Sequence, residues 1–127
     1  MRLALDTNAY TRLARGDAHI KPLVQTAEEI HVPLVVLAEL RAGFACGTLG
    51  KKNEATLTRF LNTDRVRVTL PDEQTAHHYA NLFAQLRRQG TPIPTNDLWI
   101  AALALQHDLV LVTYDEHFKC IPQLVTA

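Results

Sequence analysis

The sequence predicts an α/β fold of three layers, with a short parallel sheet between helices, over residues 1–127. Short apolar segments alternate with longer segments whose apolar residues repeat at helical spacing. The segment Leu109–Val112 is apolar throughout, as expected for a parallel strand that is covered on both faces. The segment Leu98–Leu105 is apolar on nearly every side, which is typical of a buried helix. A chain of 127 residues fits a single domain.

The first half of the chain alternates short strands with helices. An apolar strand stops abruptly at Asp6, Gly16 ends the helix after it, and Pro33 closes the second strand. We expect strands at Arg2–Leu5 and Ile30–Val32, and helices at Ala9–Arg15, Ala18–Glu29, Val35–Cys46 and Asn53–Leu61.

The second half continues this alternation. The segment Val66–Leu70 alternates as a strand does, and Pro71 and Asp72 precede a long helix that reaches Arg88. We expect the inward face of that helix to carry Ala76, Tyr79 or Ala80, Phe83, and Leu86 or Arg87. A proline-containing loop, a helix through Gln106, the strand Leu109–Val112 and a last edge strand at Gln123–Thr126 complete the prediction.

Composition excludes several classes of protein. Hydrophobic residues make up 47% and charged residues 20%, as in folded soluble domains. No apolar run approaches the roughly 20 residues that span a membrane, and Asp6 interrupts the apolar N-terminus too early for a secretory signal. We therefore expect a cytoplasmic protein. Cys46 and Cys120 are too few for a disulfide framework or a zinc site, so we expect buried free thiols.

Four acidic residues stand in apolar surroundings. Asp6 and Asp115 each follow an apolar strand, at the sheet edge where α/β proteins bind ligands. Glu39 lies within an apolar helix, and Asp97 lies in the first turn of the most apolar one. Each also has a simple structural explanation. Asp6 and Asp115 are common turn residues at strand ends, and Glu39 can face solvent. Asp97 can stabilise the N-terminus of its helix.

Taken together, the four acids favour a metal site. Two carboxylates about 4 Å apart repel by roughly 4 kcal/mol at an effective dielectric constant of 20, so a cluster of four requires a compensating cation. Oxygen ligands suit Mg²⁺ or Mn²⁺, whereas zinc is disfavoured because histidines and cysteines do not cluster. The chain has 13 basic and 13 acidic residues, so four acids neutralised in a cleft leave an excess of four basic residues outside it. Such a surface can bind a polyanion.

Four segments, in order, resemble the PIN domains. The segment Leu3–Asn8 is similar to their opening strand with its metal-binding aspartate, and Val35–Leu40 is similar to the helix that carries their glutamate. The segments Asn96–Ala102 and Leu111–Phe118 resemble the stretches with their third and fourth acids. The resemblance covers essentially the whole chain, and it implies a three-layer α/β/α PIN-like domain with a short parallel central sheet.

The resemblance also implies an activity. It points to the VapC toxins, which are Mg²⁺- or Mn²⁺-dependent endoribonucleases held inactive by a VapB-type antitoxin and which tend to form homodimers. It assigns Asp6, Glu39, Asp97 and Asp115 as catalytic metal ligands, and RNA products with 5′-phosphate and 3′-hydroxyl ends. Thr7, Asn96 and Thr113 are candidates to orient these carboxylates, or in the case of Asn96 to touch the substrate. Turn and strand-end chemistry explains the threonines equally well.

Two alternatives remain open. A degenerate PIN-like domain would only bind RNA or a protein partner, but all four acids are present. A phosphatase of the haloacid dehalogenase type would need an acid two residues after Asp6, where Asn8 stands.

Other polar and aromatic residues receive structural interpretations. None of the six histidines shares a motif with a nucleophile, and we expect His117 to pack the last turn together with Phe118. We expect Trp99 to pack in the core. Arg12 and Arg15 follow Asp6 closely, so they are candidates to seat the RNA backbone.

Overall fold

The computed structural model describes residues 1–127 and contains one parallel sheet of four strands. The strands are β1 (Arg2–Leu5), β2 (Glu29–Pro33), β3 (Val66–Thr69) and β4 (Val110–Val112), in the spatial order β3-β2-β1-β4. Leu3 of β1 pairs with Ile30 of β2 on one side and with Val110 of β4 on the other. The predicted parallel sheet is confirmed.

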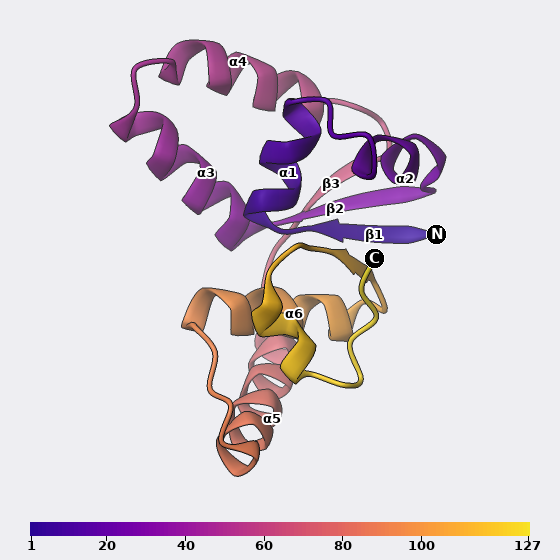
Figure 1. The fold of residues 1–127 in the computed structure, drawn as a ribbon, viewed down its shortest axis with the longest axis vertical. Coiled ribbons are helices and arrows are strands. Elements are labelled where there is room, and N and C mark those ends of the chain that lie inside the picture. Colours follow the sequence, from indigo (N-terminus) through magenta and orange to yellow (C-terminus); the bar gives the residue numbers. More distant parts are fainter.

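Six α-helices flank the sheet. They are α1 (Thr7–Ala14), α2 (Ile20–Thr26), α3 (Leu34–Cys46), α4 (Gly50–Leu61), α5 (Glu73–Gln89) and α6 (Thr95–Gln106), and a 3₁₀ helix, η1 (Glu116–Cys120), follows β4. Helices α1 and α2 lie on one side of the sheet and α5 and α6 on the other, while α3 and α4 form a pair that projects from its end (Figure 1). The three-layer α/β/α prediction is therefore confirmed.

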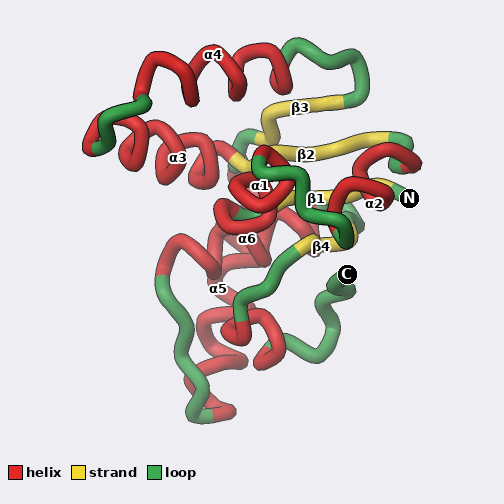
Figure 2. Tube along the Cα trace, turned by 45° about the horizontal axis from the view of Figure 1, so that its top comes forward, coloured by secondary structure: helices red, strands yellow, loops and turns green.

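Core residues lie on both sides of the sheet, from α1 and α2 on one side and from α6 on the other. Leu3, Leu5 and Leu111 of the sheet are fully buried, and α6 is buried on most of its surface, as its sequence predicts. Figure 2 shows α6 beside the strands, with α5 farther out. The N-terminus of α6 is consequently fixed beside the sheet. Asp97, in the first turn of this helix, is fixed with it.

The inward face of α5 was predicted correctly only in part: Leu86 is buried and Tyr79 packs half-buried against the core, but Ala76 and Phe83 do not face inward. Its buried residues are Thr75, Leu82 and Leu86, whereas Ala76 is exposed and Phe83 is 50% exposed. The reason lies at the start of the helix, where the hydroxyl of Thr75 contacts the side chains of Asp72 and Gln106. With Thr75 buried by these contacts, Phe83 lies on the exposed side of the helix, while Tyr79 packs on Trp99 of α6.

Smaller differences follow from local geometry. The expected strand Gln123–Thr126 is only an isolated bridge between Leu111 and Thr126, and the expected helix over Ala18–Glu29 is limited to α2. Cys46 is exposed at the end of α3 and Cys120 is half-buried, so the prediction of buried thiols was wrong. No helix has both the length and the apolar character needed to cross a membrane.

Candidate active site

The parallel topology brings two strand ends together. Leu5 and Val112, the last residues of β1 and β4, are paired neighbours in the sheet. The residues that follow them, Asp6 on one strand and Thr113 to Asp115 on the other, therefore lie at the same edge. This edge is the carboxyl end of the sheet, where open α/β folds bind ligands.

Asp6 is buried and held on both sides. It caps α1, and its Oδ1 accepts a 2.8 Å hydrogen bond from the backbone N–H of Ala9. Its other oxygen accepts a hydrogen bond from the hydroxyl of Thr113. Burial to 4% exposure raises the pKa of Asp6, and the nearby charges of Asp115 and Asp97 raise it further, against the opposing effect of the two hydrogen bonds.

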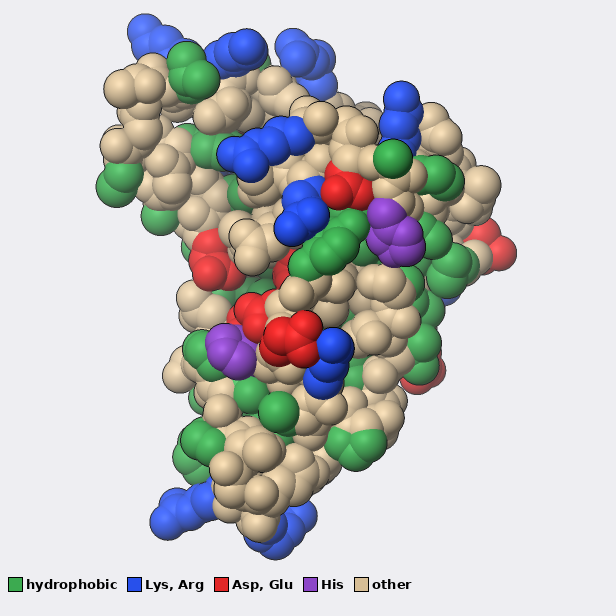
Figure 3. All heavy atoms as spheres, viewed as in Figure 1, with side chains coloured by type: hydrophobic (Ala, Val, Ile, Leu, Met, Phe, Trp, Pro, Cys, Tyr) green, Lys and Arg blue, Asp and Glu red, His purple; other side chains and the backbone are tan.

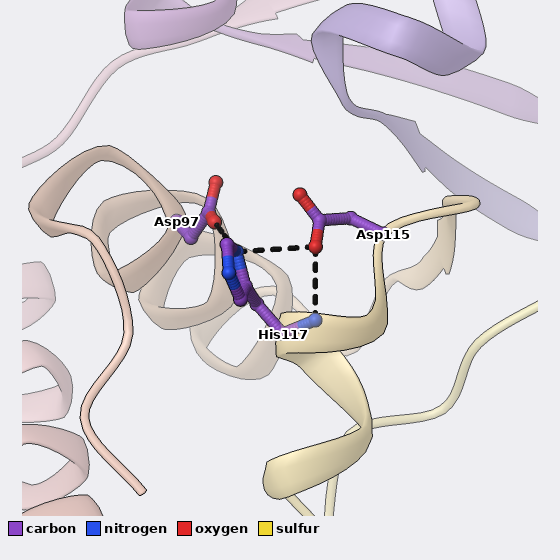
Figure 4. A group of neighbouring side chains, drawn as sticks. All are labelled: Asp97, Asp115 and His117. Atoms are coloured by element: carbon purple, nitrogen blue, oxygen red, sulfur yellow. Dashed lines mark hydrogen bonds and ion pairs between the residues drawn. The ribbon is translucent and has the colours of Figure 1, made fainter.

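Asp97 and Asp115 meet at the imidazole of His117 (Figure 4). Nδ1 of His117 lies 2.8 Å from Oδ2 of Asp97 and 3.1 Å from Oδ1 of Asp115. Burial raises the pKa of Asp97, the hydrogen bond from His117 lowers it, and the charges of Asp115 and Glu39 raise it again. The hydrogen bond to Asp97 in turn raises the pKa of His117.

Glu39 reaches the same site from α3. It lies in the second turn of that helix, where the hydroxyl of Thr7 donates a 2.9 Å hydrogen bond to its Oε1. Its charge also contributes to the raised pKa of Asp97. The structure thus brings all four acids predicted from the sequence to one edge of the sheet, from four different elements.

The candidate orienting residues divide into two groups. Thr7 contacts Glu39, whereas Thr113 contacts Asp6 and accepts a 3.0 Å hydrogen bond from the backbone N–H of Asp115. Asn96 is exposed in the first turn of α6 and forms no hydrogen bond with any of the four acids. A contact of Asn96 with substrate stays a prediction.

Of the two candidate substrate-binding arginines, Arg12 reaches the loop that carries Asp115, whereas Arg15 lies at the end of α1. The guanidinium of Arg12 lies 4.0 Å from the ring centroid of Tyr114 and 3.6 Å from a carboxylate oxygen of Asp17. Arg15 forms no ion pair and borders an open depression together with Arg12, Gly16 and Asp17. Arg15 is therefore the freer of the two to meet a phosphate.

The donor set fits a divalent cation. Asp97, Asp115 and His117 each offer one ligand atom, and these atoms lie within 4.8 Å of one another. No lysine or arginine forms an ion pair with Asp6, Glu39, Asp97 or Asp115, so no permanent positive charge balances the four carboxylates. Carboxylate oxygens in such a cluster are the ligands that Mg²⁺ and Mn²⁺ prefer.

Known proteins share this sequence pattern. The sequence profile of the PIN domain matches residues 3–124. The chain belongs to the PIN domain family. Ribonuclease VapC1 of Haemophilus influenzae is 41% identical over 81 residues, which are 61% of this chain and 60% of that relative. Ribonuclease VapC5 of Mycobacterium tuberculosis is 31% identical over 92% of this chain and 85% of that relative.

Solved structures agree with the PIN assignment over the full length. The chain superposes on VapBC from Salmonella typhimurium bound to DNA with a TM-score of 0.87, 28% identity, and coverage of 100% of this chain and 97% of that one. VapBC-1 from nontypeable Haemophilus influenzae gives a TM-score of 0.84 at 29% identity, with coverage of 100% and 97%. The sheet edge described above is thus part of a PIN fold.

His117 is the residue that the sequence interpretation missed. Phe118 packs into the core at 1% exposure as expected, but the His117 side chain remains 47% exposed and contacts two acids instead of packing the turn. The available signal was its position two residues after Asp115, at the start of a turn that carries the side chain back toward the strand end.

The surface of this PIN domain places the acids in the middle of one face. Figure 3 shows acidic side chains gathered there, with a histidine and a few basic side chains next to them and further lysine and arginine side chains toward both ends of the molecule. A polyanion that crosses this face would meet basic groups on either side of the acids.

Proposed function

We propose that this chain is a metal-dependent endoribonuclease that hydrolyses RNA phosphodiester bonds as the toxin of a VapBC-type toxin–antitoxin pair. The observation that carries the proposal is geometric: Asp97 and Asp115 offer ligand atoms within 4.8 Å of one another, and Asp6 follows the neighbouring strand end. Burial, and after it the charges of Asp115 and Asp97, raise the pKa of Asp6. The similarity to proteins named Ribonuclease VapC supports the choice of RNA. The alignment with the VapC1 relative spans 60% of its length, so the activity of the whole protein rests on this proposal.

Asp6, Glu39, Asp97 and Asp115 would hold Mg²⁺ or Mn²⁺. When bound, the cation supplies a water of lowered pKa and offsets negative charge that develops on the phosphate. The chain's own contribution is to fix the carboxylates: Thr113 holds Asp6, and Thr7 holds Glu39. Arg12 and Arg15 would seat the RNA backbone, since both line one open depression and Arg12 also reaches Tyr114, next to Asp115.

A VapB-like antitoxin is the proposed protein partner. The solved structures from Haemophilus influenzae and Salmonella typhimurium are VapBC complexes, and this chain matches them over its full length. We expect the antitoxin to abolish cleavage when it is added in equimolar amount. The homodimer implied by the resemblance stays a prediction that sedimentation equilibrium tests, and the cytoplasm is the expected location because the RNA substrate is there.

The test is cleavage of labelled structured and unstructured RNAs by purified chain without antitoxin, in Mg²⁺ or Mn²⁺. We expect cleavage that EDTA abolishes and that Asp6→Asn removes. Asp64→Asn is the matched control, because Asp64 is exposed in the turn between α4 and β3. Absence of cleavage, together with absence of metal binding in a calorimetric titration, would favour a domain that only binds RNA or protein.

A further inference from the structure

His117 is the only basic side chain that contacts the acidic cluster. Its Nδ1 lies 2.8 Å from Asp97 Oδ2 and 3.1 Å from Asp115 Oδ1. Figure 4 shows the imidazole reaching up from η1 between the two acids, while the second oxygen of each acid points away from the ring. One nitrogen thus approaches two carboxylates that belong to different elements.

These separations match those of ligands in one coordination shell. Neighbouring ligands of an octahedral ion with bonds of about 2.1 Å are about 3.0 Å apart. The two distances from Nδ1 to the carboxylate oxygens lie on either side of that value. In the tautomer that carries its hydrogen on Nε2, the Nδ1 lone pair faces the same space as both oxygens.

The backbone holds this arrangement in place. The N–H of His117 donates a 2.9 Å hydrogen bond to Oδ1 of Asp115, which is also the cap of η1. The buried ring of Phe118 anchors the next residue of the turn in the core. The imidazole is therefore positioned by a fixed turn, although its side chain is 47% exposed.

We propose that His117 binds the divalent cation directly through Nδ1, in the same shell as Asp97 and Asp115. This inference rests on the proposed metal-dependent function, and it adds a nitrogen ligand to a site that otherwise offers oxygen. Imidazole suits transition-metal ions, whereas Mg²⁺ prefers carboxylate and water. The site therefore binds Mn²⁺ in preference to Mg²⁺, and His117 is the residue that creates this preference.

The test is pulsed electron paramagnetic resonance of Mn²⁺ bound to the full chain, which detects directly coordinated ¹⁴N. We expect nitrogen coupling in the wild type, its loss in His117→Gln, and its retention in His77→Gln. His77 is exposed on α5 and forms no side-chain hydrogen bond, so it is the matched control. The Mn²⁺ affinity of His117→Gln should fall at least about tenfold, and its Mg²⁺ affinity, measured by competition, should fall less.

Three results would overturn the inference: no bound Mn²⁺, no nitrogen coupling in the wild type, or unchanged coupling in His117→Gln. Circular dichroism verifies that the variants are folded. RNA cleavage is measured on the same wild-type sample, which separates this inference from the proposed function. Cleavage without nitrogen coupling would refute only the role of His117 as a metal ligand. Nitrogen coupling without cleavage of any RNA would support that role and refute the proposed ribonuclease activity.

Discussion

The hydroxyl of Thr7 donates a 2.9 Å hydrogen bond to the carboxylate of Glu39, across 32 residues of sequence. Thr7 is the first residue of α1 and Glu39 lies in α3, so this bond joins two helices that begin at the same edge of the sheet. It fixes the one acid of the cluster that comes from a helix interior. Glu39 is only half-buried, and packing alone leaves its side chain free to turn toward solvent.

Thr7→Val should therefore lower kcat for RNA cleavage. Valine keeps the shape of threonine but cannot donate, and a hydrogen bond to a charged group contributes about 1.5–3 kcal/mol, or roughly tenfold to a hundredfold in rate. Thr7→Ser restores the donor and should restore most of the activity. Single-turnover cleavage of all three proteins measures the effect, and equal rates for the valine variant and the wild type would show that Glu39 needs no such support.

Thr113→Val should reduce stability as well as activity. The hydroxyl of Thr113 donates to buried Asp6 and accepts from the N–H of Asp115, so valine leaves both groups without this partner. A buried polar group that loses its partner costs about 1–3 kcal/mol. Urea unfolding in EDTA measures this free energy without a contribution from metal. Thr113→Ser is the control, and a valine variant as stable as the wild type would contradict the prediction.

The positions of the acids at the sheet edge could be predicted because strand ends are visible in a sequence. Asp6 and Asp115 interrupt apolar runs, and parallel pairing then brings those ends together. Glu39 and Asp97 stood out as acids within apolar helices. Helical periodicity does not identify which polar residue faces a site, so their role as metal ligands was supported by the family resemblance.

The orientation of α5 could not be predicted in the same way. Tyr79 and Phe83 lie on one possible apolar stripe and Leu82 and Leu86 on an overlapping one, so the sequence allows two rotations of the helix. The choice depends on Thr75, which reaches Gln106 on α6, 31 residues away. Long-range polar contacts of this kind have no signature in a local pattern. The contact of His117 with Asp97, 20 residues earlier, is of this kind, whereas its contact with Asp115 is local and had a signal in the sequence.

The rotation of α5 has a direct test in two adjacent residues. Leu82 is 2% exposed and Phe83 is 50% exposed. Leu82→Ala should therefore reduce the free energy of unfolding by about 2–5 kcal/mol, as deletions of buried leucine do. Phe83→Ala, although it removes more atoms, should reduce it by less than about 1 kcal/mol, part of which comes from its stacking on Tyr79. Chemical denaturation of the two variants would show the reverse order if the face predicted from periodicity were correct.

Without metal, the Asp6→Asn variant should become more stable than the wild type as pH rises. Burial raises the pKa of Asp6 above its ordinary value of 3.8, so the folded state holds this proton more tightly than the unfolded state. The stability that this protonated carboxyl contributes is fully present below pH 3.8, the ordinary pKa of aspartate. It is lost as pH rises through the higher pKa that Asp6 has in the folded protein. Asparagine does not ionise and loses nothing over that range.

The measurement is the melting temperature of both proteins in EDTA across this pH range. We expect the Asp6→Asn variant to melt at the same temperature as the wild type near pH 3 and at a higher temperature at neutral pH. Added Mg²⁺ should raise the melting temperature of the wild type and not that of the variant, because the ligand is lost. A wild type that melts higher than the variant in EDTA at neutral pH would mean that the Asp6 charge is compensated within the protein.

The role of Arg15 in RNA binding can be separated from that of Arg12. Arg12 is engaged with Tyr114 and Asp17, so its removal disturbs the loop that carries Asp115. Arg15 forms no ion pair, so Arg15→Gln removes a charge without breaking a contact. If it meets a phosphate of single-stranded RNA, the slope of log kcat/KM against log salt should become shallower by about 0.7, and kcat/KM at low salt should fall several-fold.

Arg88→Gln provides the matched control for Arg15→Gln, because Arg88 is also exposed and without an ion pair but lies near the C-terminal end of α5. We expect its slope to equal that of the wild type. The double variant Arg12→Ala/Arg15→Ala should lose more cleavage than Arg15→Gln alone, since it removes both basic charges of the depression. Cleavage and salt dependence that stay unchanged in the double variant would mean that RNA approaches the acids from another side, and the basic residues of α3 and α4 would then be the next to replace.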